Sequence, residues 1–302
     1  MHRKHRRTPH ITLIWLLTAL LWTPSASVSA DKPAEPRKLW TTEVVFQQPE
    51  SVAYDAERGY MYVSNINGEP TERNEVGFIA RLDLEGNVES LGWVTGLNAP
   101  KGLDIWGDRL YVADIDTLVE IDLDSGDIIG RYRDADAEFL NDVAVAPDGT
   151  VYVSDMMADA IYRLRDGSFE RWLQTSELAG PNGLLVEEDS LIVGSWGLIT
   201  EGFETEEPGH LKMVSRDDGA VRSLGDGRPV GNLDGVQPDG HGNYYVTDWI
   251  SGKLYRIRPS GDFDVVLELE QGLADHVFVE DENLLLLPLM MSGRVVAYRV
   301  GD

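Results

Sequence analysis

The residues of this sequence that could carry out chemistry recur at one position of a repeated pattern. Six similar segments each open with a polar residue and continue into a short alternating run; the opening residues are Glu50, Lys101, Asn141, Asn182, Asp234 and Asp275. Glu50, Asn141, Asn182 and Asp234 are oxygen donors, a set that suits a hard divalent cation, Ca²⁺ first and Mg²⁺ or Mn²⁺ next. Because the set contains neither Cys nor His, it disfavours a structural zinc site, and Zn²⁺ is a lesser alternative. A water-filled channel whose polar side chains only bind one another is an equally open interpretation.

Residues near these positions supply candidate substrate contacts. Lys101 could stabilise an oxyanion, or it could simply neutralise Glu50 or Asp275. His276 follows Asp275 and is the histidine best placed to act as a base, although strand alternation points it away from the channel. Apolar residues follow the second strand of the repeats and predict an apolar rim around a polar floor; they are Ile66, Ile115, Met156, Trp196, Trp249 and Met290.

The repeats also predict the architecture. Their opening residues lie 40 to 52 positions apart in a chain of 302 residues. Each repeat contains strands with period-2 alternation, joined by turns such as Asp-Gly and Gly-Asn. Four strands in about 40–45 residues are typical of a propeller blade. The sequence therefore predicts an all-β, six-bladed β-propeller with four-stranded antiparallel blades, in which the opening residues converge at one mouth of the channel.

The two ends of the repeat region predict how the ring closes. The sixth repeat ends after its third strand, near Val300, and residues 39–46 precede the first repeat without a hairpin partner. We expect this N-terminal segment to complete the last blade, which removes an exposed edge and makes residues 39–302 one domain. The loops 66–78 and 196–209 are longer than their counterparts, belong to opposite blades, and should face each other across the mouth.

The first thirty residues have the pattern of a secretory signal peptide. Basic residues between positions 3 and 7 precede an apolar run at 11–22 and the small residues Val28, Ser29 and Ala30. The apolar run is short for a bilayer span of about 20 residues, so an uncleaved anchor is the weaker alternative. Residues 31–38 form a polar leader. The sequence predicts a periplasmic or secreted protein that has no membrane contact after cleavage.

Composition restricts the partners. Lys and Arg number 26 against 52 Asp and Glu, which gives a formal net charge of −26, and the chain has no Cys. A nucleic-acid partner or an anionic membrane surface is therefore disfavoured. Disulfides, thiolate metal sites and a cysteine nucleophile are excluded. A small-molecule partner is expected, and a protein partner is left open.

Four motifs resemble a known family. Glu50 in PESVAYD, Asn141 in LNDVAVAPDG, Asn182 in GPNGLLV and Asp234 in LDGVQPDGHG are similar to the metal-site motifs of the senescence marker protein/gluconolactonase/luciferin-regenerating-enzyme family. The likeness covers about residues 40–300. It implies a six-bladed propeller with a divalent cation, commonly Ca²⁺, on Glu50, Asn182 and Asp234, and a ligand or substrate-orienting role for Asn141. Where the sugar lactonases of that family have an Arg, this chain has Phe139.

Two hypotheses follow for the function. The first is an exported, metal-dependent hydrolase of a lactone or related ester, in which the cation activates a carbonyl or a water. Asp234 would be ligand and proton acceptor, Asn141 would orient the substrate oxygen, and Lys101, Asp275, His276, Trp196, Trp249 and Met156 would contact substrate. The second is a non-catalytic propeller, similar to proteins with NHL-type repeats, that binds a ligand or a protein and holds a structural cation.

Overall fold

The computed structural model describes residues 1–2 and 35–301. Residues 3–30 of the predicted signal peptide and 31–34 of the predicted leader lie outside the described residues, so both stay predictions. In the part of the chain that is described, no helix has the length and apolar character needed to cross a membrane.

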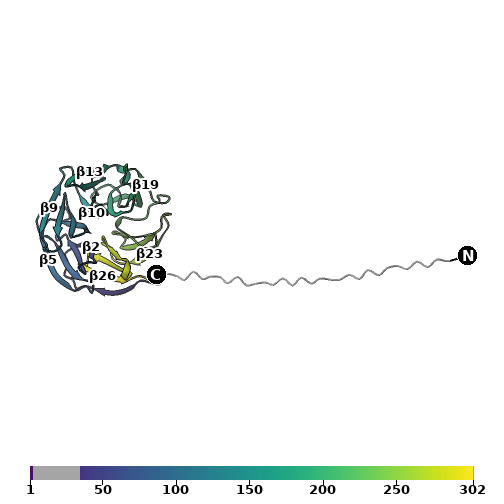
Figure 1. The fold of residues 1–302 in the computed structure, drawn as a ribbon, viewed down its shortest axis with the longest axis horizontal. Coiled ribbons are helices and arrows are strands. Elements are labelled where there is room, and N and C mark those ends of the chain that lie inside the picture. The colour runs from purple at the N-terminus through teal and green to yellow at the C-terminus, as the bar shows by residue number, and fades with distance from the viewer. Residues whose placement is uncertain (3–34, 302) are drawn as a thin grey trace. The chain divides into compact units, whose positions relative to one another are not determined.

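Six antiparallel sheets of four strands stand around a central axis within the described residues (Figure 1), which confirms the six-bladed β-propeller. Blades one to three comprise β2 (Pro49–Asp55), β3 (Tyr60–Asn65), β4 (Gly77–Asp83) and β5 (Val88–Leu97); β6 (Pro100–Trp106), β7 (Arg109–Asp114), β8 (Thr117–Asp122) and β9 (Ile128–Arg133); and β10 (Leu140–Val145), β11 (Val151–Asp155), β12 (Ala160–Arg165) and β13 (Ser168–Gln174).

Blades four to six continue the same order. They comprise β14 (Pro181–Val186), β15 (Ser190–Ser195), β18 (Leu211–Ser215) and β19 (Val221–Ser223); β20 (Leu233–Pro238), β21 (Tyr244–Asp248), β22 (Lys253–Ile257) and β23 (Phe263–Glu268); and β24 (Val277–Val279), β25 (Leu284–Leu289), β26 (Arg294–Arg299) and β1 (Arg37–Thr41). A hairpin of β16 (Gly197–Ile199) and β17 (Thr205–Pro208) forms within the long loop of blade four.

The N-terminal strand closes the ring as predicted, although its limits differ. β1 pairs antiparallel with β26, from Arg37 opposite Arg299 to Thr41 opposite Val296. The strand therefore covers 37–41 rather than 39–46. Beyond Thr41 the chain leaves the sheet and Phe46 enters the core, where it is 2% exposed among residues of blades six and one. Burial of this aromatic ring and backbone hydrogen bonds from Thr42 to Val295 and from Phe46 to Gly293 fix the second half of the segment.

The hydrophobic core lies between neighbouring blades, not on the axis. Each of the larger clusters joins two adjacent blades; between blades one and two, for example, Tyr62 and Ile79 pack with Leu110 and Val119. Side chains alternate along each strand, so every blade has two apolar faces and packs on both sides. The axis is consequently free for the polar residues at the start of each first strand.

Candidate functional site

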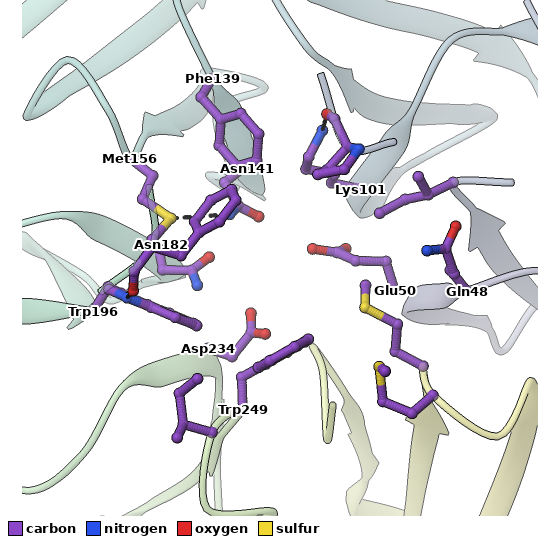
Figure 2. Close-up of a pocket in the computed structure, with 16 residues that line it drawn as sticks. Gln48, Glu50, Lys101, Phe139, Asn141, Met156, Asn182, Trp196, Asp234 and Trp249 are labelled. Atoms are coloured by element: carbon purple, nitrogen blue, oxygen red, sulfur yellow. Dashed lines mark hydrogen bonds between the residues drawn. The ribbon is translucent and has the colours of Figure 1, made fainter. Parts of the chain in front are cut away.

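One end of the channel opens into a cavity of about 260 Å³ with a polar floor. Its lining includes five of the six opening residues, namely Glu50, Lys101, Asn141, Asn182 and Asp234. The side chains of Glu50, Asn141, Asn182 and Asp234 come from four different blades and point toward one common point (Figure 2). The structure thus brings together the four oxygen donors that the sequence proposed as cation ligands.

A β-bulge at the start of the first strand aims each of these five side chains. The pairing register shifts by one residue between Pro49 and Val52 in blade one, and at the equivalent place in blades two to five. A bulge places an extra residue in one strand and redirects its side chain. Sequence alternation alone did not predict these bulges, which turn the opening residues into the channel.

Hydroxyl groups on the second strands hold three of the bulges. Ser64 accepts a hydrogen bond from the N–H of Ser51 at 2.9 Å, Ser154 from Asp142 at 2.9 Å, and Thr247 from Gly235 at 2.8 Å. These N–H groups directly follow Glu50, Asn141 and Asp234. A bulged N–H loses its ladder partner, and the hydroxyl replaces it. The sequence signal of these bulges is a Ser or Thr that precedes an Asp or Asn at the end of the second strand, as in Ser64-Asn65, Ser154-Asp155 and Thr247-Asp248.

Aspartates that end the second strands of blades two and three position the chain that leads into the first strand of the same blade. Asp155 accepts from the N–H groups of Glu138 and Phe139 at 2.8 and 3.0 Å. Asp114 accepts in the same way from Ala99, at 2.8 Å. Each carboxylate therefore fixes the chain two or three residues before the opening residue of a first strand. That opening residue is Asn141 for Asp155 and Lys101 for Asp114.

The floor of the cavity fits a divalent cation. Glu50 Oε2 and Asn182 Oδ1 are buried, and neither has a hydrogen-bond partner within the described residues. Burial, followed by the charges of Asp234 and Asp275, raises the pKa of Glu50 well above its ordinary value. Burial and the charge of Asp275 also raise the pKa of Asp234, while the amide of Asn182 lowers it. Unpartnered oxygens and adjacent buried carboxylates are what a bound cation would satisfy.

The ligand chemistry is mixed, not purely acidic. Among the described residues, no cluster of three or more His, Cys, Asp and Glu side chains could hold a metal. The floor instead combines two carboxylates with two amides. Glu50, Asn182 and Asp234 could hold the cation, with the Oδ1 of Asn141 as a further donor, since the Nδ2 of Asn141 is directed to Met156 Sδ at 3.7 Å. Hard oxygen donors of this kind suit Ca²⁺.

Lys101 has partners other than the acids that the sequence suggested. Its Nζ donates to the carbonyls of Pro70 at 3.0 Å and Ala99 at 2.9 Å, and lies 4.4 Å from the centre of the Phe139 ring. Among the ion pairs of the described chain, none joins Lys101 to Glu50 or Asp275. Burial lowers the pKa of Lys101 to about 8, and the charge of Glu50 opposes this shift. Lys101 ties the loop of blade one to the pocket wall.

Asp275 and His276 do not line this cavity. Asp275 accepts from Ser51 Oγ and from the N–H of His276, and it lines a second cavity farther along the channel together with Asp104 and Asp142. In blade six the register also shifts by one residue, between Leu273, which bridges Leu289, and Val277, which pairs with Leu286. The irregularity therefore begins two residues before Asp275, whereas in the other blades it begins one residue before the opening residue. Leu287 and Pro288 stand where Ser154 and Asp155 stand in blade three, so blade six has neither that hydroxyl nor that carboxylate.

His276 is fully buried, and within the described residues both of its ring nitrogens lack partners. Burial lowers the pKa of His276 to about 3, which keeps the imidazole neutral. Its position outside the cavity gives it no access to a substrate there.

The predicted apolar rim largely lines the cavity. Ile66, Met156, Trp196, Trp249 and Met290 are part of the wall, whereas Ile115 packs behind it against Ile66 and Ala99. The two long loops both reach the mouth, through Pro70 from one side and Phe203 from the other. Phe203 sits at the turn of the β16–β17 hairpin, so this loop is an ordered wall of the pocket.

Comparison with solved structures supports the fold. A gluconolactonase from Xanthomonas campestris is 17% identical with a TM-score of 0.64, and the match covers 88% of this chain and 95% of that one. Regucalcin from Agrobacterium tumefaciens, a calcium-binding protein, is 16% identical with a TM-score of 0.61, covering 87% and 96%. A virginiamycin B lyase from Staphylococcus aureus is 12% identical with a TM-score of 0.59, covering 88% and 99%.

The sequence comparisons are more specific. No curated protein sequence is similar enough to this chain to count as a relative. The model of the SMP-30/Gluconolactonase/LRE-like region, in contrast, matches residues 48–278, which include Glu50, Asn141, Asn182 and Asp234. By this match over most of its length, the chain belongs to the SMP-30/gluconolactonase/LRE-like family.

Proposed function

We propose that this chain is an exported hydrolase of a lactone or related ester and that it depends on a divalent cation, Ca²⁺ in the first place. The observation that carries the proposal is the convergence of Glu50, Asn141, Asn182 and Asp234 on one point, with buried oxygens that lack partners. Membership of a family that includes gluconolactonases supports a lactone as the substrate class.

The bound cation would supply Lewis acidity, polarising a carbonyl and lowering the pKa of a water molecule. Asp234 is the candidate proton acceptor, because it is a carboxylate of the cavity floor that lies beside the other proposed ligands and receives a hydrogen bond from Asn182. The Nδ2 of Asn141 has only the weak acceptor Met156 Sδ, so it can donate to a substrate oxygen.

The walls of the cavity would exclude water from the reaction. The floor residues are nearly inaccessible, with Glu50 5% and Asp234 3% exposed. Electrostatic interactions strengthen in such an environment, because little solvent screens them. Lys101 keeps the blade-one loop in place through Pro70, which preserves the shape of the wall.

The proposal is tested by assaying a panel of lactones with Ca²⁺, Mg²⁺, Mn²⁺ or Zn²⁺ added to the chelator-treated protein, alongside Asp234→Asn and Glu50→Gln. Turnover that requires the cation and is lost in both variants is the expected result. Absence of turnover across the panel while the cation demonstrably binds would refute the hydrolase. For export, the N-terminus of protein recovered from the periplasm or medium should lie near residue 31.

One observation favours a non-catalytic propeller with a structural cation. The lining of the cavity contains no histidine, serine or threonine, so the floor residues alone would have to move protons. In that case Asp234→Asn would lower the melting temperature in Ca²⁺, and no lactone or ester would be hydrolysed by either protein.

A further inference from the structure

The walls of the cavity are largely apolar, in contrast to its polar floor. Besides the four oxygen donors, the lining includes Phe139, Met156, Trp196, Phe203, Trp249 and Met290; Figure 2 shows Phe139, Met156, Trp196 and Trp249 around the donors. These side chains come from blades three to six and surround the space in which any substituent of a bound substrate would lie. Gln48, Lys101 and the indole N–H groups of Trp196 and Trp249 are the further side-chain polar groups that the described residues add to the lining.

The aromatic residues form one connected wall. The rings of Trp196 and Trp249 are 6.1 Å apart, Trp196 and Phe203 are 6.5 Å apart, and Phe139 and Phe203 are 5.5 Å apart. Tilted and edge-on pairs at these separations are favourable and keep the rings in place. The indole N–H of Trp196 donates to the carbonyl of Phe203 at 2.9 Å, so this polar atom is not offered to a ligand.

Gln48, through its oxygen, and Lys101 are engaged within the protein. The Oε1 of Gln48 accepts from the N–H of Gly68 at 2.9 Å. The Nζ of Lys101 donates to two carbonyls and rests over the Phe139 ring. A sugar lactone brings several hydroxyl groups, and each one buried against this wall without a partner costs roughly tenfold in affinity. An alkyl group gains about fourfold for each methylene that it buries there.

We propose that the substrate is a small lactone or ester with an apolar alkyl or aryl substituent, and that polyhydroxylated sugar lactones are rejected. The inference rests on the proposed hydrolytic function, and the aromatic wall carries it. The cavity of about 260 Å³ lies at the small end for ligand pockets, which limits the substituent to a short chain or a single ring.

The first experiment compares δ-lactones that share one ring size. With Ca²⁺ present, kcat/KM should rise about fourfold per methylene from δ-hexalactone to δ-decalactone until the cavity is filled, and D-glucono-δ-lactone should be the poorest substrate. Hydrolysis of the glucono-δ-lactone at a rate equal to or above that of δ-decalactone would overturn the inference while supporting a lactonase.

The second experiment measures binding alone, with ligands that are not hydrolysed. Quenching of tryptophan fluorescence reports binding of 6-pentyl-2-piperidone and of unsubstituted 2-piperidone, which are stable lactam analogues. The pentyl compound should bind at least tenfold more tightly. If it does so and no lactone is hydrolysed, the apolar preference is supported and the hydrolytic function is refuted. Equal binding of the two lactams would overturn the preference.

Two variants test whether the aromatic wall causes the preference for apolar substituents. Trp249→Ala should reduce the ratio of the kcat/KM values for δ-decalactone and δ-hexalactone at least fivefold. Phe203→Ser tests the same wall from the β16–β17 hairpin, where the side chain is 40% exposed. Trp106→Ala is the matched control, because Trp106 is 44% exposed and lies outside the cavity. Unchanged ratios in both wall variants would contradict the inference.

Discussion

Glu50→Gln should change the stability of this protein in opposite directions with and without a cation. In the cation-free protein, Glu50 Oε2 is buried without a partner within the described residues, and Asp234 and Asp275 oppose its ionisation. Glutamine keeps the volume and removes the charge, so the cation-free variant should melt higher than the wild type at pH 8. The variant lacks one of the proposed cation ligands, so Ca²⁺ should raise its melting temperature very little.

The expected size follows from general magnitudes. A buried polar group without a partner costs about 1–3 kcal/mol and a charged one costs more; glutamine leaves a polar group in place, so the gain is the part due to charge, taken as about 1–3 kcal/mol. Unfolding entropy of about 2.1 cal/mol/K per residue converts this into roughly 2–5 °C for a propeller of this length. A cation at a hundred times its Kd adds about 2.7 kcal/mol, or roughly 5 °C, to the wild type. The cation-free variant should therefore melt at a higher temperature than the cation-free wild type, and Ca²⁺ should raise the melting temperature of the variant by almost nothing.

The assay is thermal unfolding followed by circular dichroism at pH 8, in chelator and in a Ca²⁺ titration. Glu188→Gln is the matched control, because Glu188 is an exposed residue outside the channel and the same charge is removed. An equal Ca²⁺-dependent shift in Glu50→Gln and wild type would refute the assignment of Glu50 to a cation site. A lower melting temperature of the cation-free variant would refute the argument from buried charge.

Three further predictions concern the elements that position the site. Ser154→Ala removes the acceptor of the Asp142 N–H, so stability should fall by about 1 kcal/mol in urea unfolding and Ca²⁺ affinity should fall with it; unchanged affinity would show that the bulge does not need the hydroxyl. Burial raises the pKa of Asp104 to about 6, above its unfolded value, so the contribution of Asp104 to the stability of the cation-free protein should be full below about pH 4 and should be lost as pH rises through 6. In Asp104→Asn the fall in stability between about pH 4 and pH 6 should be smaller. A fall equal to that of the wild type would mean that other groups cause it. Deleting residues 35–41 removes β1 and exposes the edge of β26, so calorimetry should show a broad, non-cooperative transition; a sharp transition near the original temperature would mean that the ring closes without β1.

The architecture was predictable because it repeats. Strand alternation and turn residues recur in six segments whose opening residues lie 40 to 52 positions apart, so the repeats support one another even where one of them is ambiguous. The limits of the closing strand were less predictable. Leu39 and Phe46 are both apolar residues of one short segment, and only packing against blades six and one shows that the strand ends at Thr41 while Phe46 enters the core.

The site was predictable as far as the repeats extend. Glu50, Asn141, Asn182 and Asp234 were found because they occupy one position in equivalent strands. Asp275 occupies the same position in the sequence but lines the second cavity, because the register shift of blade six begins two residues before it instead of one. The contact of Phe203 with the pocket was not predictable, since it depends on the hairpin that the long loop of blade four forms.

The balance of charge along the channel gives an independent reason to expect a cation. Carboxyl groups with raised pKa values line up from the mouth inward, and they are Glu50, Asp234, Asp275, Asp142 and Asp104. Lys101 is the basic residue of the mouth lining, and it is bound to backbone carbonyls instead of to these acids. The whole chain carries a formal net charge of −26, so basic residues elsewhere do not offset the charge of these carboxyl groups. At neutral pH the channel must therefore take up protons or a cation, and the unpartnered oxygens of Glu50 and Asn182 mark where a cation would bind.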